Sequence, residues 1–322
     1  MKALICITSC NRIDEVKKYI LPYIDFVNNN EDFHFVLAHD GLSQDYIDFC
    51  AEFEIPLIYS DKREGVGLSK NRVLKQFPDF DYYFFIDDDV ELFDDRIFSR
   101  HISISQKAQP NFHHLSSTSL FEVLDCNFVD NHKVLYNKRG GGYFNFFTKQ
   151  GLETVGGWHT DFAKYKRYGH TEHSYRFVNS GLSKYPFNVI QQCINMLAVH
   201  NPEHVTKPII ERVDPSNELF DLEKKIIESK LDFFPLSTIS KFNFNAYSTK
   251  TCEKVAIYLN ENKHLYPFLN GKNRRRALSS HYFHGFLVNS KGFRIINLFK
   301  SFLLFPNNPA IKHWIKTKLL RK

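Results

Sequence analysis

Short apolar runs alternate with helical patterns through the first part of the chain, over residues 1–95. Polar or turn residues bound each run, which is typical of buried strands. The runs read KALICITS, FHFVLAHD, PLIYS and DYYFFIDDD. Between them, residues 13–27, 46–53 and 67–77 carry apolar side chains at helical spacing. Strands that alternate with helices in this way predict an α/β fold, with a mostly parallel sheet that helices cover on both faces.

Polar residues follow three of these runs at the point where each run ends. Ligands of a parallel α/β sheet bind in a crevice at the carboxyl ends of the strands. Residues 8–12 end the first run, Asp40 ends the second, and Asp87, Asp88 and Asp89 end the fourth. We therefore expect these residues, which lie far apart in the sequence, to converge on one crevice.

The three consecutive aspartates point to a metal site in that crevice. Alone, such a triplet is more often a solvated turn or a helix start, because adjacent carboxylates repel one another. At the end of a buried extended strand, however, Asp87 and Asp89 point to the same side. Two carboxylates with no basic neighbour in the sequence suit Mg²⁺ or Mn²⁺, and either ion can bridge to phosphate oxygens. The triplet therefore predicts a metal-bound diphosphate.

Four motifs along the chain carry a family resemblance. In order, they read ITSCNR, LAHDGLSQD, EGVGLSKNRVL and FFIDDD. Together they resemble the nucleotide-sugar glycosyltransferases of the GT-A fold, particularly the large inverting family 2 with its Asp-x-Asp motif. The resemblance covers roughly residues 3–205. It implies a Rossmann-like catalytic domain over 1–205, with a nucleotide-binding half at about 1–95 and an acceptor half at about 96–205.

The resemblance assigns roles to the residues of these motifs. It implies a UDP-sugar donor and a divalent metal, with Asp89 as the principal metal ligand and Asp87 beside it. Two positions depart from the family's pattern, since Leu42 replaces the usual serine and Lys70 stands where arginine is commoner. The residues implied to bind the nucleotide and its phosphates are Thr8, Asn11, Arg12, Asp40, Gly67, Lys70, Asn71, Asp87 and Asp88.

A later segment resembles the part of the family fold that holds the donor sugar. It reads GGGYFNFFTKQGLETVGGWHTDF and then YKRYGHTEHSYRF. Glycine allows a backbone to approach a ligand closely, and the resemblance implies that Gly141 and Gly142 lie near the donor sugar. His200 follows a predicted final strand, where several relatives carry a histidine that completes the metal shell. The alternative for His200 is a structural role.

Inverting transfer needs a general base that deprotonates the acceptor hydroxyl. The family carries an acidic pair for this purpose at the start of a helix. Alignment on the Ser-Tyr-Arg stretch at 174–176 puts a Gly-His pair, residues 169–170, at that position. We predict Glu172 as the base, followed by His170 and then Asp161. The alternative for Glu172 is a carboxylate that only stabilises the helix N-terminus.

Positive charge is concentrated at the end of the sequence. Residues 262–322 contain thirteen Lys and Arg and no Asp or Glu, so the rest of the chain has 29 basic and 36 acidic groups, a net charge of −7. Apolar residues and Trp314 accompany the basic ones, and such a segment can lie in the headgroup plane of an anionic membrane. We predict a helical, cationic extension over 206–322 that binds a membrane surface through residues 262–322.

Two alternatives for this extension remain open. A helix packed on the body with a solvated basic face is one, and a site for an anionic acceptor polymer is another. Nucleic-acid binding is not predicted, because no recognition motif accompanies the charge.

Cysteine usage and hydropathy indicate the compartment. The six cysteines show no CxxC pairing, which predicts reduced, buried thiols. The N-terminus lacks a secretory signal pattern, and no segment reaches roughly 18 uninterrupted apolar residues. The sequence therefore predicts a cytoplasmic protein that is peripheral on the inner face of the cell membrane.

The predicted function is transfer of a hexosyl or N-acetylhexosaminyl group, with inversion, from a UDP-sugar to a glycan or lipid-linked acceptor. The predicted setting is synthesis of a bacterial surface polysaccharide, capsule or lipopolysaccharide. One alternative is a nucleotidyltransferase on a similar sheet, although the expected glycine-rich basic loop is missing from ITSCNR. The other is a non-catalytic glycan- or membrane-binding protein of the same fold, which the absent acidic pair makes credible.

Overall fold

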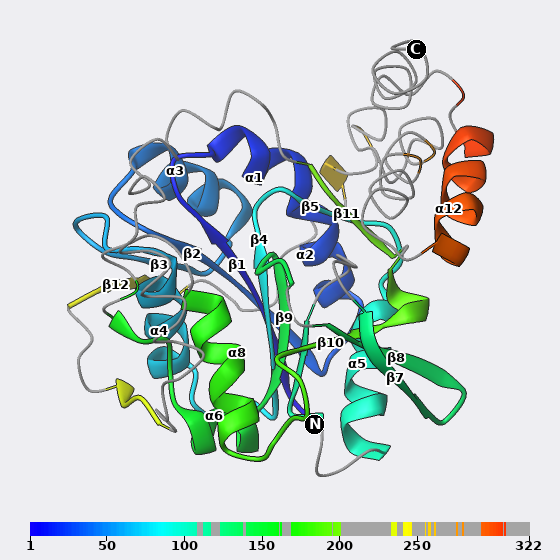
Figure 1. Cartoon of the computed structure of the whole chain (residues 1–322). Coiled ribbons are helices and arrows are strands. Elements are labelled where there is room, and N and C mark those ends of the chain that lie inside the picture. Colours follow the sequence, from blue (N-terminus) through cyan, green and yellow to red (C-terminus); the bar gives the residue numbers. More distant parts are fainter. Residues whose placement is uncertain are drawn as a thin grey trace, which may run out of the picture.

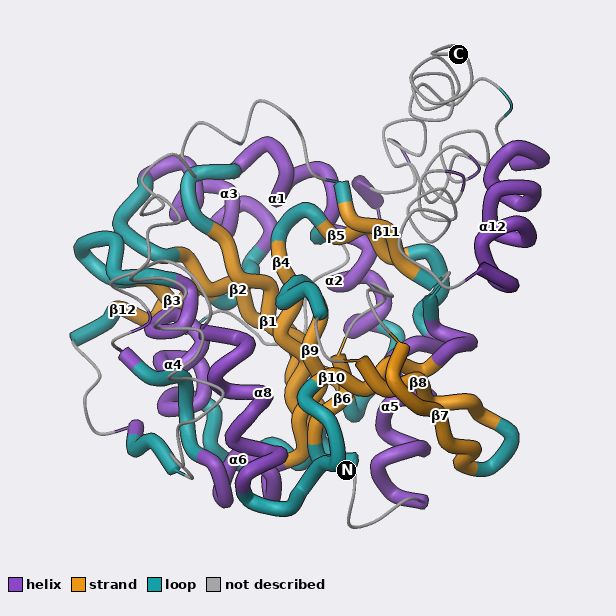
Figure 2. The backbone as a smooth tube through the Cα atoms, viewed as in Figure 1, coloured by secondary structure: helices purple, strands orange, loops and turns teal. Residues whose placement is uncertain are grey.

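The computed structural model describes most of residues 1–200 and shorter stretches beyond them. The described residues are 1–107, 112–116, 123–137, 140–160, 162, 169–194, 196–200, 233–236, 241–246, 255, 257–258, 261, 275, 279, 291–304 and 306. Figure 1 shows them coloured along the sequence, and Figure 2 shows the same view coloured by secondary structure.

A seven-stranded sheet forms the centre of the molecule, in the order β12-β3-β2-β1-β4-β9-β6 (Figure 2). The neighbours β3, β2, β1 and β4 are parallel, whereas β9 pairs antiparallel with β4 and β6, and β12 pairs antiparallel with β3. The strands are β1 (Ala3–Ser9), β2 (Phe33–His39), β3 (Leu57–Tyr59), β4 (Tyr82–Asp87), β6 (His114–Ser116), β9 (Phe144–Thr148) and β12 (Asn243–Asn245). The predicted α/β fold with a mostly parallel sheet is confirmed.

Helices cover both faces of this sheet, because successive residues of β1 point into two separate apolar cores. Ala3, Ile5 and Ile7 enter one core, and Leu4 and Cys6 enter the other. The first core is closed by α1 (Ile13–Tyr19), α2 (Leu21–Asn28), α3 (Gln44–Phe53) and α5 (Arg96–Lys107). The second is closed by α4 (Val66–Gln76), α6 (Lys149–Val155) and α8 (Gly169–Asn179).

The sequence predicted one helix over residues 13–27, and this prediction is wrong in one respect. The structure has two helices there, α1 and α2, with Ile20 between them. Pro22 lies in the first turn of α2. Proline lacks the N–H that a continuous helix would need and is tolerated in a first turn, so the chain restarts at this point.

Two smaller sheets flank the central one. The order of the first is β10-β8-β7, from β7 (Val123–Val129), β8 (His132–Asn137) and β10 (Phe187–Ile190), and the short 3-10 helix η1 (Gln191–Cys193) follows β10. The second pairs β5 (Val90–Leu92) antiparallel with β11 (Leu197–Val199). This pairing returns the chain at His200 to the end of β4, where the aspartates lie.

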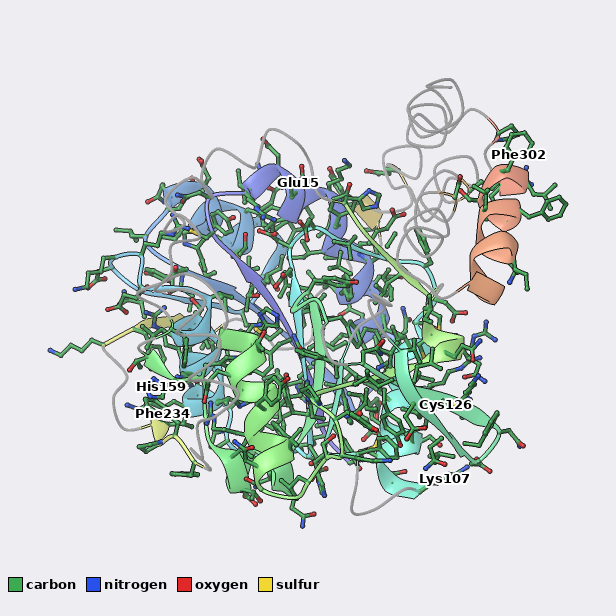
Figure 3. All side chains as sticks on the ribbon, viewed as in Figure 1. Glu15, Lys107, Cys126, His159, Phe234 and Phe302 are labelled. Atoms are coloured by element: carbon green, nitrogen blue, oxygen red, sulfur yellow. The ribbon has the colours of Figure 1, made fainter. Side chains whose placement is uncertain are left out.

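The predicted domain boundary at residue 205 does not separate the described later segments from the body. β12 is an edge strand of the central sheet, and Val255 is buried in its first core. Phe234 donates its N–H to the Val155 carbonyl (3.0 Å), and its ring lies 4.4 Å from that of His159. Figure 3 labels both residues. Part of the predicted extension is therefore a strand of the central sheet and a bridge to Gly156.

Cysteine and membrane predictions can be checked within the described part of the chain. Its five cysteines, Cys6, Cys10, Cys50, Cys126 and Cys193, are all free. Cys126 is exposed and Cys10 half-buried, so the prediction that all are buried is wrong for these two, and Cys252 lies outside the described residues. No helix among the described residues is long and apolar enough to cross a membrane.

Candidate functional site

The carboxyl ends of β1 and β4 meet at one point because the two strands are parallel neighbours. Their register pairs Thr8 with Asp87, and the Thr8 hydroxyl donates to Asp87 Oδ1 (3.4 Å). The loop after β1 carries Arg12 across the end of β4. The expected convergence of the first and fourth apolar runs is therefore present.

Arg12 joins the second and third aspartates. One guanidinium nitrogen, Nη1, donates to Asp88 Oδ1 (2.7 Å) and to Asp89 Oδ2 (3.0 Å). Ser9 adds a hydroxyl bond to Asp88 Oδ2 (2.5 Å). The sequence predicted that Asp87 and Asp89 would share a side. β4 ends at Asp87 and the chain turns at residues 88–89, so strand alternation no longer sets the direction of Asp89. The charge of Asp87 still acts on Asp89 and raises its pKa.

Burial dominates the acid–base properties of these carboxylates. Asp88 and Asp89 are each 4% exposed, and the pKa of each is raised to about 7. Loss of water is the largest cause, the charges of neighbouring aspartates act in the same direction, and Arg12 opposes the shift. Burial also raises the pKa of Asp87, against the charges of Lys70 and Arg12. The site is thus a buried negative cluster that cations stabilise.

Tyr46, which the sequence did not single out, helps to hold Arg12 in position. The Tyr46 hydroxyl accepts the backbone N–H of Arg12 (2.9 Å) and lies 2.6 Å from the Ser9 hydroxyl. Asn11 adopts a left-handed backbone conformation (φ 54°), and its N–H donates to Nε2 of His39 (3.4 Å). The position of Ser9 at the end of β1 could have indicated a role, but nothing in the sequence links α3 to this loop.

The geometry of Asp88 and Asp89 is compatible with a divalent cation. Their two oxygens already share one positively charged atom, Arg12 Nη1, which occupies the place of a bridging cation. Mg²⁺ and Mn²⁺ commonly use one or two carboxylates and fill their other positions with phosphate oxygens and water. Within the described residues, no group of three His, Cys, Asp or Glu side chains is arranged to hold a metal ion. The fit is therefore to two carboxylates, and the remaining ligands would come from the substrate.

His200 does not join this pair through its side chain. Its backbone N–H donates to the Asp89 carbonyl (2.9 Å), but its ring bonds Glu91 Oε2 (2.6 Å) and stacks on Tyr19 at 4.8 Å. Glu91, which is 2% exposed, was not among the residues that the sequence identified. The structure thus places His200 beside Asp89 and turns its ring to Glu91, an arrangement that does not match the predicted ligand set of Asp87, Asp89 and His200.

Lys70 supplies a second cation at the cluster. It is 3% exposed, and its ammonium group lies over the rings of Trp158 (5.3 Å) and Phe85 (5.9 Å). Burial lowers its pKa, and the nearby charge of Asp87 opposes that shift. Gly67, one turn earlier on α4, lies against Trp158, because a Cβ there would come within 3.1 Å of the Trp158 Cβ. Gly67 therefore allows α4 to pack closely on the residue that shields Lys70.

Asn71 has a different role from the predicted one. It is fully buried, and its amide group pairs with the backbone of Trp158, as donor to the carbonyl (2.7 Å) and acceptor from the N–H (2.7 Å). This two-bond clamp fixes the segment after α6. The prediction that Asn71 lies close to the nucleotide is not supported, because both ends of its amide are used inside the protein.

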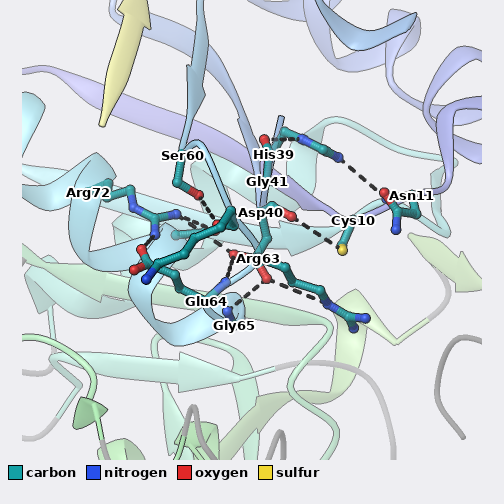
Figure 4. Close-up of polar contacts among 12 residues, drawn as sticks. Cys10, Asn11, His39, Asp40, Gly41, Ser60, Arg63, Glu64, Gly65 and Arg72 are labelled. Atoms are coloured by element: carbon teal, nitrogen blue, oxygen red, sulfur yellow. Dashed lines mark hydrogen bonds and ion pairs between the residues drawn. The ribbon is translucent and has the colours of Figure 1, made fainter. Parts of the chain in front are cut away.

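Asp40 also bonds inside the protein (Figure 4). Its two carboxylate oxygens accept the backbone N–H groups of Glu64 and Gly65, each at 2.8 Å. Arg72, which has no exposed surface, pairs with Glu64 and lies 3.9 Å from Asp40. Asp40 thus ties the end of β2 to the loop that starts α4, and the predicted bond to a nucleotide base would have to be shared with these contacts.

The glycine loop approaches protein side chains. A Cβ on Gly142 would lie 2.8 Å from the ring of His170, and one on Gly140 would lie 2.7 Å from the ring of Phe187. His170 Nε2 lies 3.3 Å from both the Gly140 carbonyl and the Thr171 hydroxyl, and a proton on Nε2 would satisfy the carbonyl and leave Nδ1 as an acceptor. Burial and, to a smaller extent, the charge of Lys70 lower the pKa of His170 to about 4. A neutral histidine therefore lies between the glycine loop and the Lys70 side of the site.

Glu172 is engaged in a buried ion pair. It is 3% exposed and binds Arg176 one turn later on α8, with Arg176 Nε 2.7 Å from Oε1. Arg176 also donates to the carbonyls of Val155 (2.5 Å) and Gly157 (2.6 Å). Burial raises the pKa of Glu172, and the charge of Arg176 opposes this shift. These contacts favour a structural role over the predicted role of base, and Asp161 lies outside the described residues.

Comparisons with known proteins concern the general fold. No protein-family model matches the chain, and no curated protein matches it. Among solved structures, the mannosyltransferase PcManGT from Pyrobaculum calidifontis, in complex with GDP-Man and Mn²⁺, is 10% identical over 98% of this chain and 75% of its own, with a TM-score of 0.42. TarS 1–349 from S. aureus, in complex with UDP-GlcNAc, is 10% identical over 98% of this chain and 92% of its own, with a TM-score of 0.48.

Two further matches cover less of the matched protein. A longer TarS structure is 10% identical, and this chain spans 54% of its length, with a TM-score of 0.41. The glycosyltransferase GlyE from Streptococcus pneumoniae is 10% identical over 75% of this chain and 54% of its own, with a TM-score of 0.30. The matched structures include proteins that their names describe as a mannosyltransferase and a glycosyltransferase. The roles of individual residues are argued from the geometry of this chain.

Proposed function

We propose that the chain is a glycosyltransferase that uses a nucleoside diphosphate sugar as donor. The observation that carries the proposal is the buried cluster of Asp87, Asp88 and Asp89 at the carboxyl ends of β1 and β4, with Arg12 and Lys70 beside it. This is where a parallel α/β sheet binds its ligand. Two fixed cations and a pair of converging carboxylates suit a diphosphate that brings its own divalent ion.

The residues of the site would have different roles in sugar transfer. Arg12 and Lys70 would bind the diphosphate oxygens, and Asp87, held by Thr8, would accept a hydrogen bond from the ribose. A bound Mg²⁺ or Mn²⁺ would be held by Asp88 and Asp89 and would supply charge neutralisation to the leaving diphosphate. Arg12 must release at least one carboxylate for this, which makes Arg12 and the cation competitors for the same oxygens.

Of the two predicted bases that the structure describes, His170 is the better placed. Its ring lies against Gly142, and its Nδ1 is left as an acceptor by the Nε2 contact with the Gly140 carbonyl. An anionic diphosphate beside Lys70 would offset that cation and raise the low pKa of His170 toward the working pH. The acceptor hydroxyl would then give its proton to Nδ1 as the sugar is transferred with inversion.

The finer assignments rest on the sequence. UDP is the proposed nucleotide, and a hexosyl or N-acetylhexosaminyl group is the proposed cargo. The proposed acceptor is a glycan or lipid-linked glycan of a bacterial surface polysaccharide, reached from the cytoplasmic side. These assignments follow from the family resemblance and from the cationic end of the chain.

A binding test and a turnover test together check the proposal. Thermal unfolding is measured with UDP, GDP and a panel of UDP- and GDP-sugars, with and without Mn²⁺, and release of free nucleoside diphosphate is followed for the sugars that stabilise the protein. The same measurements are made on Asp89→Asn and, as a control, on Asp125→Asn, an exposed carboxylate on β7 that pairs with Lys184. We expect a metal-dependent shift with one nucleotide sugar, slow release, and loss of both in Asp89→Asn alone.

Other outcomes point elsewhere. No shift with any nucleotide would overturn the donor site. A shift without release in the presence of glycans would favour a non-catalytic binding protein, a reading that gains some support from the engagement of Glu172 with Arg176. Release of pyrophosphate from a nucleoside triphosphate would favour the nucleotidyltransferase.

A further inference from the structure

The helix α12 (Lys291–Leu304) presents apolar side chains to solvent. Figure 1 shows it at the periphery of the molecule, away from the central sheet. Four large side chains on it are about half exposed or more: Ile296 (52%), Phe299 (63%), Phe302 (48%) and Leu303 (64%). Phe302 projects outward in Figure 3. Exposed apolar residues that occur singly need no explanation, but a group of them on one helix marks an interaction surface.

The four residues share one side of the helix. Ile296, Phe299 and Leu303 follow one another at spacings of three and four, which align side chains along a helix, and Phe302 flanks this stripe. Ser301 lies on the opposite side and has no exposed surface. Its hydroxyl donates to the Ser279 carbonyl (2.5 Å), and the Ser279 hydroxyl donates back to the Ser301 carbonyl (2.7 Å). The serine pair therefore fixes which side of α12 faces the protein.

This orientation differs from that of an ordinary surface helix, which usually buries its apolar stripe and exposes its polar side. Among the described side chains of α12, Ser301 is buried and Leu298 and Leu304 are half-buried, whereas the four large apolar residues named above face outward. An apolar side of this size is typical of a surface that binds an apolar partner.

Charge identifies the partner. Residues 262–322, which contain α12, have thirteen Lys and Arg and no Asp or Glu, whereas the remaining residues carry a net charge of −7. A second copy of this region would repel the first, and an anionic bilayer would attract this region and repel the rest of the molecule. We propose that the apolar side of α12, formed by Ile296, Phe299, Phe302 and Leu303, inserts into the headgroup and acyl boundary of an anionic membrane, and that the basic residues of 262–322 bind the lipid phosphates.

Vesicle binding by the full-length chain tests this surface. Cosedimentation is measured with phosphatidylcholine vesicles and with vesicles that also contain phosphatidylglycerol, for the wild type and for the double variant Phe299→Ser, Leu303→Ser. The control is Phe128→Ser, a 69% exposed phenylalanine on β7. We expect binding to the anionic vesicles that weakens at high salt, a loss of affinity of about tenfold or more in the double variant, and no change in the control.

Folding and self-association are monitored in the same samples. Both substituted residues are largely exposed, so the thermal unfolding temperature of the double variant should match the wild type within about 2 °C. Equal vesicle binding by wild type and double variant would show attraction by charge alone and would overturn insertion of the helix. Absence of binding to anionic vesicles, or a dimer in solution that the double variant abolishes, would overturn the membrane assignment. None of these results depends on nucleotide binding, so the proposed transferase activity is tested separately.

Discussion

At the scale of single residues, Arg12 controls the charge of the candidate site. One of its nitrogens donates to two carboxylates that are each 4% exposed, so a single positive charge stabilises both. The side chain of Arg12 itself is 21% exposed, so the pair lies at the edge of the protein and can exchange partners with a ligand. Arg12 thus stabilises the cluster and also occupies the carboxylate oxygens that a cation would need.

Replacing Arg12 should make the protein less stable and more responsive to divalent ions. In Arg12→Ala the two carboxylates lose their counter-ion, and we expect a decrease in the free energy of unfolding on the order of 2 kcal/mol. Because the competitor is gone, the apparent affinity for Mn²⁺ should rise about tenfold. Thermal unfolding over a Mn²⁺ titration measures both effects, with the half-exposed Arg63→Ala as control. A weaker Mn²⁺ response in Arg12→Ala would contradict the competition.

Glu172 and His170 are distinguished by what their removal should cost. Glu172→Gln leaves Arg176 buried without its counter-ion, so we expect a stability loss on the order of 3 kcal/mol by chemical denaturation. Turnover per folded molecule should stay within about threefold, since the carboxylate is not the proposed base. His170→Gln should have the opposite profile, with stability nearly unchanged and turnover reduced about 100-fold or more. A large loss of turnover in Glu172→Gln, with turnover nearly unchanged in His170→Gln, would instead support Glu172 as the base.

At the scale of elements, the helices bury polar groups against aromatic ones. On α5, His101 is fully enclosed, donates from Nδ1 to the Ile97 carbonyl (2.7 Å) and packs against the rings of Phe144 and Phe146. Burial lowers the pKa of His101 to about 4. The helix is therefore stable only with this histidine neutral.

The pH dependence of stability follows from this shift. Above pH 6.5 His101 is neutral in both states and does not reduce the stability of the folded protein. As the pH falls from 6.5 to 4, the unfolded chain binds a proton that the folded chain excludes, so stability falls by roughly 3 kcal/mol in total from this residue. His101→Phe should show a shallower decline in unfolding free energy over that range. An unchanged pH dependence in His101→Phe would show that the residue is not buried neutral.

At the scale of the whole molecule, the late segment at 233–236 closes the turn after α6. Gly157 donates its N–H to the Phe234 carbonyl (3.0 Å). The preceding residue, Gly156, also faces Phe234 and has a φ of +74°. A Cβ on Gly156 would come within 2.0 Å of the Phe234 carbonyl oxygen. Two parts of the chain that are distant in sequence thus require a glycine at their contact.

Two glycines with similar backbone angles test that contact. Gly156→Ala and Gly181→Ala both place a side chain at positive φ, +74° and +71°, but nothing lies within 4 Å of a Cβ on Gly181. We expect Gly181→Ala to cost about 1 kcal/mol and Gly156→Ala about 3 kcal/mol or more, measured by denaturation. In a chain truncated after residue 205, the two costs should become equal. Equal costs in the full chain would mean that 233–236 does not pack there.

The sequence alone determined the parallel part of the sheet and which strand ends meet at its edge. Local patterns suffice for this, because apolar periodicity defines strands and helices, and parallel strands bring their carboxyl ends together whatever else the chain does. They could not show that Arg12 would bond both Asp88 and Asp89, since that depends on where β4 stops and the turn begins. Nor could they show that the polar groups of Asn71, Asp40 and Glu172 form hydrogen bonds or an ion pair within the protein. Those partners are backbone groups and an arginine brought together by packing, and only the tertiary structure decides which side chains remain for a ligand.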